Sequence, residues 1–315
     1  MTEKQHLYKT GIIGNCAFIA HVNENTDISW LCLPRFDSSF VFGSLLDKEK
    51  GGEFSIKPTG DFASEQSYIE NTNVLRTEIT AKDGKYRITD FAPRFHLHER
   101  YYKPLMLVRK IEPLEGNPRI TIKCKPVCDY GRSEMKANRG SNHIHFQGCD
   151  EHMQLSTNVS LNYILDEKAF VLNETKYLIL TYGYNLEAPI ESTVENFLRA
   201  TTAYWRKWIK HSSIAGFYQP LVIRSALVLK IHQYEDTGAI IAASTTSLPE
   251  FPGSTRNWDY RYCWLRDSFY VLTSLNHIGH FEEMEKYFNY LSDISFADDL
   301  RYQPLYSITG ERQIT

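Results

Sequence analysis

The sequence ESTVENFLRATTAYWRKWIKHS, residues 191–212, marks the point at which the pattern of the chain changes. Its apolar and aromatic side chains recur every three or four residues, which predicts an amphipathic helix with one buried stripe. Ser192 followed by Glu195 fits a capping box, so we expect the helix to begin at this pair. The predicted stripe comprises Val194, Phe197, Leu198, Thr201, Tyr204, Trp205, Trp208 and Ile209.

Upstream of this helix the chain has the pattern of short strands. RITIKCK (119–125) alternates apolar and polar residues, which predicts a strand with one buried face. FIAHV (18–22) and ISWLCL (28–33) flank the turn-rich sequence NENTD, which predicts a hairpin. Similar segments at short intervals predict an antiparallel β-sandwich over residues 1–188, with one short helix around residues 40–47.

Downstream of residue 189 we expect helices in pairs. LVIRSALVLKIHQY (221–234) is apolar on all sides, which favours a helix in an inner position. A third helix is expected from Trp264 to about His277, where Gly279 ends it, and FEEMEKYFNYLSDI (281–294) predicts a fourth. The fold class is therefore a multidomain β + α protein, with a boundary between residues 188 and 189.

Composition sets the broad class of the protein. A chain of 315 residues is long enough for about two domains. Its net charge of −3 argues against nucleic acid or an anionic membrane as a partner. No run approaches the ~18 apolar residues of a membrane span, and the polar start MTEKQHLYKTG lacks the apolar segment of a signal peptide. We therefore expect a cytoplasmic protein.

Cysteine and histidine are the candidate metal ligands. The chain contains Cys16, Cys32, Cys124, Cys128, Cys149 and Cys263, which we expect to be buried free thiols. His143 and His145 share one face of a predicted strand near Cys149. These three residues could bind a metal, but two strand histidines that face solvent are the simpler interpretation. Cys124 and Cys128 are four positions apart, which is not the C-x-x-C spacing of a zinc or redox site. The sequence predicts no metal and no cofactor.

The segment RNWDYRYCWLRDSFY, residues 256–270, combines six aromatic rings with the charged pair Arg266–Asp267. Aromatic faces suit the C–H faces of a sugar, while guanidinium donors and carboxylate acceptors suit adjacent hydroxyls. Charge-assisted hydrogen bonds would strengthen such recognition. The alternative is structural: Asp267 is a first-turn helix residue, Arg266 its ion-pair partner, and the rings belong to the core.

RNWDYRYCWLRDS strongly resembles the signature of glycoside hydrolase family 15, the glucoamylase-like and trehalase-like enzymes. The resemblance extends over essentially the whole chain, in order. It includes IGNCAFIAHVNENTDISWLCLPRFDSSFVFGSLLDKEKGG (13–52), NTNVLRTEI, ITDFAP, YWRKWI and SALVLKIHQYEDTGAIIAASTTSLPE. The resemblance implies an N-terminal antiparallel β-domain with a trehalase-like character. It also implies that residues 189–315 form the first hairpins of an α/α barrel of six helical hairpins.

The resemblance also implies roles for particular residues. Arg266 and Asp267 would hydrogen-bond hydroxyls of the terminal glucose, and Tyr260 and Trp264 would line the same subsite. Asp259 and Tyr262 would shape the loop. The expected substrate is an α-glucoside: a maltooligosaccharide, an isomaltooligosaccharide or trehalose.

The implied reaction is inverting hydrolysis by a carboxylic acid and a carboxylate base, about 6.5–9.5 Å apart. No carboxylate in the sequence matches the family's acid or base. The candidates set aside are Glu235 and Asp236, read as solvated, Glu282, Glu283 and Glu285, read as a surface helix face, and Glu250, Asp298, Asp299 and Glu311. We expect a chain truncated relative to its family, with its catalytic pair beyond Thr315 and no glucosidase activity of its own. The alternative is a non-catalytic carbohydrate-binding or structural fragment.

Overall fold

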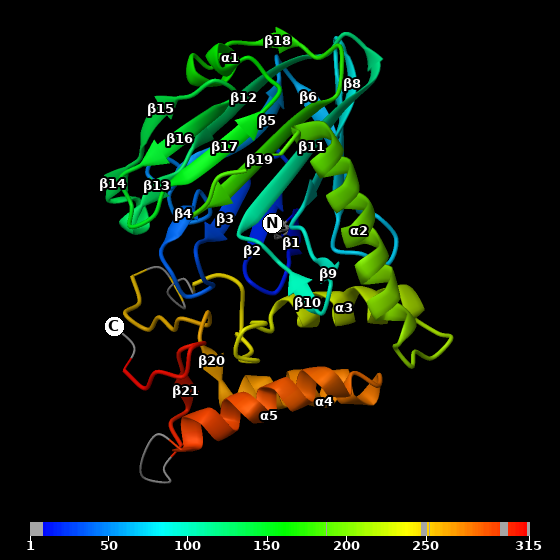
Figure 1. Ribbon diagram of the computed structural model, residues 1–315, viewed down its shortest axis with the longest axis vertical. Coiled ribbons are helices and arrows are strands. Elements are labelled where there is room, and N and C mark those ends of the chain that lie inside the picture. The colour runs from blue at the N-terminus through cyan, green and yellow to red at the C-terminus, as the bar shows by residue number, and fades with distance from the viewer. Residues whose placement is uncertain (1–8, 187, 247–250, 252, 297–301, 314–315) are drawn as a thin grey trace, which may run out of the picture.

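A computed structural model describes residues 9–186, 188–246, 251, 253–296 and 302–313. Glu250, Asp298 and Asp299 lie outside the described residues. Figure 1 shows strands in the upper part of the molecule, helices α3, α4 and α5 below them, and α2 running down one side between the two. We call residues 9–182 the strand-rich part and residues 190–313 the helix-rich part.

The strands pair antiparallel throughout the described part of the chain. The largest sheet has the order β15 (Lys136–Arg139), β16 (His143–Gln147), β17 (Met153–Thr157), β19 (Lys176–Tyr182), β11 (Met106–Gly116), β8 (Gly84–Phe91), β7 (Leu75–Ala81), β6 (Phe62–Tyr68). A second has the order β18 (Phe170–Val171), β12 (Arg119–Lys125), β5 (Glu53–Pro58). A third comprises β1 (Thr10–Gly14), β2 (Ile19–Asn23), β3 (Ile28–Cys32) and β4 (Phe40–Phe42).

Short elements complete the strand-rich part. They are the pair β9 (Phe95–Leu97) and β10 (Arg100–Tyr102), the pair β13 (Val127–Cys128) and β14 (Ser133–Glu134), helix α1 (Leu161–Leu165) and the 3-10 turn η1 (Asp129–Gly131).

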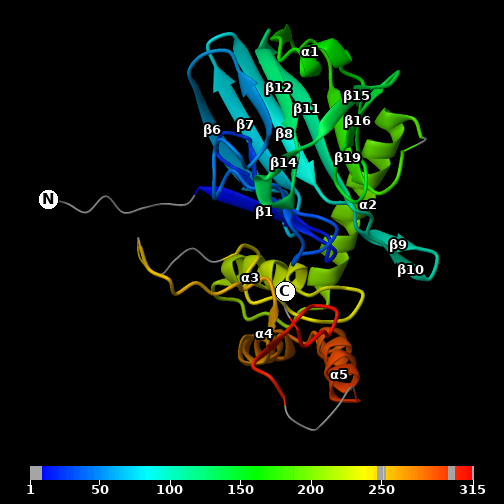
Figure 2. The same cartoon turned by 90° about the vertical axis from the view of Figure 1, so that its left-hand side faces the viewer.

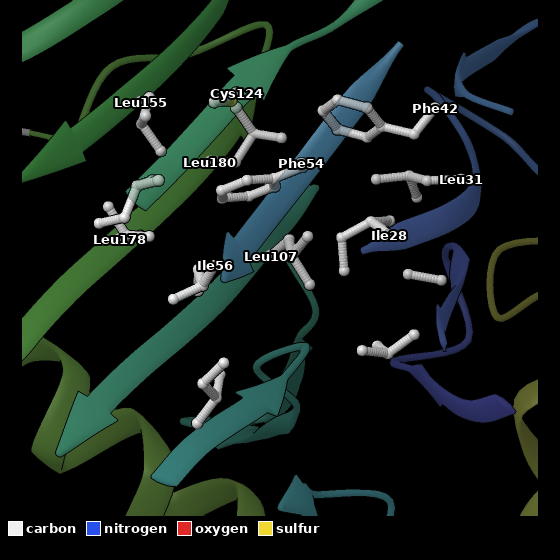
Figure 3. Packing of buried hydrophobic residues seen from close by; sticks show 14 of the residues in the cluster. Ile28, Leu31, Phe42, Phe54, Ile56, Leu107, Cys124, Leu155, Leu178 and Leu180 are labelled. Carbon is white, nitrogen blue, oxygen red and sulfur yellow. The ribbon is translucent and has the colours of Figure 1, made fainter. Parts of the chain in front are cut away.

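The inner faces of these sheets share one apolar core, as a β-sandwich requires. Side chains from all three sheets meet there, and Figure 3 shows Phe54 and Ile56 of β5 near Leu107 of β11, with Phe42 of β4 to the right of Phe54. The predicted alternation of β12 is confirmed: Ile120, Ile122 and Cys124 are buried, and the residues between them are not. The predicted β2–β3 hairpin is also confirmed.

The predicted short helix at residues 40–47 is wrong. Residues Phe40–Phe42 form strand β4, and the next residues form turns. The amide of Gly43 donates to the carbonyl of Gly51 at 2.6 Å, and a Cβ added at Gly51 would lie 2.4 Å from backbone of Gly43. The chain folds back tightly here because glycine permits that close approach.

The prediction that all six cysteines are free thiols is also wrong. Cys128 and Cys149 form a disulfide whose Cα atoms are 5.7 Å apart. A long-range pairing of this kind has no local sequence signal, because it depends on how β13 and the end of β16 meet in the fold. The remaining cysteines, Cys16, Cys32, Cys124 and Cys263, are buried thiols as expected.

His143 and His145 share a face of β16, as predicted, with ring centroids 4.4 Å apart. Across the part of the chain that the structure describes, there is no group of three or more His, Cys, Asp or Glu side chains that could hold a metal ion.

Helix α2 (Ile190–Lys210) begins one residue after Pro189, which is its N-cap. The predicted capping box is wrong. The Ser192 hydroxyl donates to the Pro189 carbonyl at 3.3 Å, while the Glu195 carboxylate accepts from the Tyr177 hydroxyl at 3.0 Å. Pro189 is the N-cap instead: its carbonyl accepts from the amide of Thr193 at 3.1 Å, and its missing N–H removes no bond within the helix.

The predicted stripe of α2 does face the interior. Val194 packs against the strands beside Phe91 and Met106, and Tyr204 and Trp205 pack among the helices. The other helices are α3 (Gln219–Ile231), α4 (Leu265–His277) and α5 (Phe281–Phe296). As predicted, Gly279, with φ of +89°, separates α4 from α5.

Helix α3 lies between the strands above and α4 with α5 below, as both views show (Figures 1 and 2). Its predicted inner position holds at Ala226, Leu227 and Ile231, which are buried, but Leu221 near its start is exposed. None of the helices that the structure describes is both long enough and apolar enough to span a membrane.

Candidate functional site

Segments from distant parts of the helix-rich part lie side by side around residues 257–264. The amides of Ala242 and Ala243 donate to the carbonyls of Tyr262 and Tyr260 at 3.3 and 2.8 Å. On the other side, β20 (Cys263–Trp264) pairs with β21 (Leu305–Tyr306). These contacts place the chain after α3, the aromatic loop and the segment after α5 together.

Two of these segments, the aromatic loop and the segment after α5, line a pocket of about 620 Å³. Aromatic side chains supply much of its wall, and the Trp258 and Trp264 ring centroids are 6.3 Å apart. The lining residues are Asn257, Trp258, Asp259, Tyr262, Trp264, Gln303, Pro304, Leu305 and Arg312. Flat apolar faces beside amide and charged groups can bind a sugar, which carries both kinds of surface.

Hydrogen bonds within the loop fix its shape. The Asp259 carboxylate accepts from the backbone amide of Arg261 at 2.9 Å and from its guanidinium at 2.6 Å. The Asp259 carbonyl accepts from the Trp264 indole at 3.1 Å. Asp259 therefore shapes the loop in the way expected of it, and it also lines the pocket.

The predicted sugar-binding residues form two pairs. Tyr260 contacts Trp264, with ring centroids 5.5 Å apart. Arg266 donates to the Asp267 carboxylate at 3.0 Å in the first turn of α4, with the side chains 70% and 31% exposed. Among these residues Trp264 lines the pocket; Tyr260, Arg266 and Asp267 are not in the lining as described.

Several lining residues were not predicted. The sequence analysis assigns no role to Trp258, although its place in the aromatic segment is a signal for one. Gln303, Pro304, Leu305 and Arg312 lie in a polar C-terminal stretch without helical periodicity. They reach the pocket through the β20–β21 pairing, a long-range contact that local pattern does not reveal.

Glu235 is buried, so its interpretation as a solvated residue is wrong. Its side chain is 7% exposed and pairs with Arg94 at 2.6 Å and Lys286 at 2.5 Å. Burial by itself would raise the pKa of Glu235, but the cations of Arg94 and Lys230 lower this pKa to about 2. The neighbouring Asp236 is half exposed, as predicted.

The prediction that Glu282, Glu283 and Glu285 all lie on a surface face of α5 is wrong for Glu283. Glu282 and Glu285 are exposed, but Glu283 is 2% exposed and accepts from Lys230 at 3.1 Å and from the Trp208 indole at 2.9 Å. Burial opposes its ionisation, but Lys230 lowers the pKa of Glu283 to about 2. One side of α5 packs inward, and Glu283 lies on that side.

These paired charges form what we call the junction cluster: Arg94, Lys230, Glu235, Glu283 and Lys286. It joins the strand-rich part, through Arg94, to α3, the chain that follows it and α5. A general acid must be protonated at working pH. Both carboxylates of the cluster have lowered pKa values and are already paired with cations, an arrangement that favours the ionised form.

The structure therefore defines a β-sandwich-like part joined to packed helices, with an aromatic and polar pocket in the helix-rich part. The sequence comparisons are more specific. The family model described as "Trehalase-like, N-terminal" matches residues 2–171, and that of "Glycosyl hydrolases family 15" matches residues 216–315.

Individual relatives agree with these matches. Trehalases of Thermoplasma volcanium and Thermoplasma acidophilum are 38% and 37% identical, over 96% and 90% of this chain and 50% of each relative. A trehalase of Mycobacterium tuberculosis is 30% identical over 91% of this chain and 46% of its own length. The chain spans about half the length of the curated relatives it matches. It belongs to glycoside hydrolase family 15, with a trehalase-like N-terminal region.

Proposed function

We propose that this chain carries the terminal-glucose subsite of a trehalase-type glycoside hydrolase. The pocket between the aromatic loop and the segment after α5 supports the proposal most directly, because it combines indole faces with amide and charged groups. Trp264 lines this pocket and Tyr260 contacts Trp264. In the proposed subsite, Arg266 and Asp267 bracket adjacent glucose hydroxyls from the first turn of α4. Trehalose is the favoured substrate, because the compared relatives are named trehalases.

Sugar binding requires the Arg266–Asp267 pair to exchange one hydrogen bond for bonds to hydroxyls. Arg266 is largely exposed and Asp267 is partly exposed, and an ion pair in contact with solvent contributes only about 0–1 kcal/mol. Opening it therefore costs little, and charge-assisted bonds to a sugar compensate. We further propose that residues 1–188 form one domain and that residues 189–315 begin a barrel of helical hairpins.

Hydrolysis with inversion needs an acid and a base on opposite sides of the glycosidic bond. Within the described residues, the carboxylate in the pocket lining is Asp259, which Arg261 already holds. Glu235 and Glu283 belong to the junction cluster. We therefore propose that the acid and the base lie beyond Thr315 and that residues 1–315 bind sugar without cleaving it.

The test uses the purified chain. Trehalose, maltose and isomaltose are titrated while tryptophan fluorescence is followed, and glucose release from trehalose and maltooligosaccharides is assayed in parallel. We expect saturable binding, weakened by Arg266→Ala, and no glucose release. Absence of sugar binding would contradict the subsite, and turnover that Arg266→Ala abolishes would contradict the assignment of catalysis to residues beyond Thr315.

A second candidate is a sugar-binding protein that does not take part in hydrolysis. This candidate is favoured because Asp259 and both junction-cluster carboxylates already form ion pairs within the protein. A chimera that joins this chain to the second half of the Thermoplasma volcanium trehalase separates the two. Trehalose hydrolysis by the chimera, lost on Arg266→Ala, supports the enzyme subsite; a folded chimera that binds trehalose without cleaving it supports the second candidate.

A further inference from the structure

Arg261 is a buried cation within the exposed aromatic loop. Its side chain is 3% exposed, whereas that of Arg266 in the same segment is 70% exposed. A guanidinium removed from water must have its charge paired and its N–H groups bonded, because an unpaired buried charge is strongly destabilising. The contacts of Arg261 therefore show what holds it there.

On one side Arg261 reaches across to the strand-rich part. Its Nη1 donates to the Ser38 carbonyl at 2.7 Å and lies 3.5 Å from the Cys32 sulfur. Its Nη2 donates to the Tyr130 hydroxyl at 3.3 Å, and the guanidinium lies 5.7 Å from the centroid of that ring. Cys32 ends β3, Ser38 precedes β4 and Tyr130 lies in η1, so one side chain contacts three segments of the strand-rich part.

On the other side Arg261 holds the pocket wall. Its Nε and Nη2 donate to the Asp259 carboxylate at 3.1 and 2.6 Å. The carbonyl of Asp259 accepts from the Trp264 indole at 3.1 Å, and both Asp259 and Trp264 line the pocket. A displacement of Arg261 would therefore move Asp259, which it contacts directly, and Trp264, which is hydrogen-bonded to Asp259.

The segment that supplies Tyr130 has an unfavourable backbone. Asp129 and Tyr130 have φ values of +44° and +56°, in the left-handed region that non-glycine residues rarely occupy. Such a conformation is unfavourable for a non-glycine residue and persists only where surrounding structure holds it. Here the Cys128–Cys149 disulfide lies immediately before the turn, and the β13–β14 pairing closes it.

We propose that Arg261 is a positioning residue, through which the strand-rich part sets the place of Asp259 and Trp264 in the sugar pocket. This inference rests on the proposed sugar subsite. It gives the strand-rich part a role in substrate recognition, although Arg261 itself does not line the pocket. Arginine is required because its planar group donates in several fixed directions at once, which the single ammonium of lysine cannot do.

The test compares two buried arginines in the full chain, each substituted by methionine. Arg261→Met should weaken trehalose binding by about tenfold or more, the loss of roughly one well-placed polar interaction. Arg94→Met is the matched control, because Arg94 is also buried between the two parts but pairs with Glu235, outside the pocket lining. It should lower the melting temperature yet leave the dissociation constant within about twofold.

A second readout reports geometry without sugar. The fluorescence of Trp264, obtained as the difference between wild type and Trp264→Phe, should shift in Arg261→Met and not in Arg94→Met. Arg261→Lys should restore part of the lost affinity. Tyr130→Phe, a mild change that preserves the fold, should shift the dissociation constant in the same direction by about two- to threefold.

Unchanged trehalose affinity and Trp264 emission in folded Arg261→Met would overturn the positioning role. An equal loss of affinity in Arg94→Met would overturn it too, because the effect would then follow from general destabilisation. If wild type binds no sugar, the proposed subsite fails, and the Trp264 emission by itself decides whether Arg261 positions the loop.

Discussion

The junction cluster and the Arg266–Asp267 pair are both built from opposite charges, but they differ in access to water. In the junction cluster Arg94 is fully buried, and the Glu235 and Glu283 side chains are 7% and 2% exposed. The Arg266 side chain is 70% exposed and forms an ion pair with Asp267. The same chemistry therefore has different consequences in the two regions.

A buried charge remains stable only while it is paired with the groups around it. Desolvation of an ion costs several kcal/mol, so a buried carboxylate is stable only while its cations and donors remain in place. An exposed pair exchanges partners with water at little cost, and so it can exchange them with sugar hydroxyls. We infer that the junction cluster holds the two parts of the molecule together and that the exposed pair is available to ligand.

The largest effect is expected when the junction cluster loses an anion. Glu235→Ala leaves Arg94 buried without its carboxylate and should lower the free energy of unfolding by about 3–5 kcal/mol. Urea denaturation measures the loss. Glu282→Ala is the control, because Glu282 also pairs with Lys286 but is exposed, and it should cost less than about 1 kcal/mol. Similar losses in the two variants would contradict the distinction drawn from burial.

Acid should weaken the same region. The pKa of Glu235 and that of Glu283 are lowered to about 2 in the folded chain, from an ordinary value of 4.5. Their stabilising contribution is therefore complete above pH 4.5 and is lost as the pH falls from there toward 2. The shift corresponds to roughly 3 kcal/mol for each group.

Unfolding free energies measured at intervals from pH 6 down to pH 2.5 test this expectation. The decline below pH 4.5 should be shallower in Glu235→Gln than in wild type, because one of the responsible carboxyls has been removed. Equal slopes in the two proteins would show that other groups control acid unfolding.

Sequence pattern predicted those elements that local periodicity determines. Helix α4 runs over Leu265–His277, so it begins one residue after the predicted start at Trp264. Its end at His277 agrees with the prediction, because Gly279 interrupts the helical pattern. Strand β12 matches its predicted bounds, because its alternation reflects one buried face. The capping box failed at Ser192, because a proline one position before the helix already sets its start.

Features that depend on distant contacts were not predictable in this way. Glu283 has the residue type of a surface position, and its burial follows from Lys230 on another helix. Cys128 and Cys149 are separated by 21 positions and meet only through the arrangement of strands. In the candidate site, the aromatic loop was found from its residues, whereas Gln303 and Leu305 reach the pocket through the β20–β21 pairing.

The smallest effect on stability is expected at the exposed pair, where it separates the two interpretations of Asp267. If Asp267 is only a first-turn helix residue, Asp267→Asn should cost about 0.3–1 kcal/mol through the helix dipole and leave sugar binding unchanged. If it also binds hydroxyls, the same small loss should accompany a decrease in trehalose affinity of about tenfold.

Glu191→Gln is the matched control for this prediction, because Glu191 is an exposed acid in the first turn of a different helix, α2, and is not part of the proposed subsite of Tyr260, Trp264, Arg266 and Asp267. Thermal unfolding and trehalose titration of both variants give the comparison. We expect similar small stability losses and a loss of affinity in Asp267→Asn alone. A stability loss above about 2 kcal/mol in Asp267→Asn would mean that the pair is structural, because an exposed ion pair does not contribute that much.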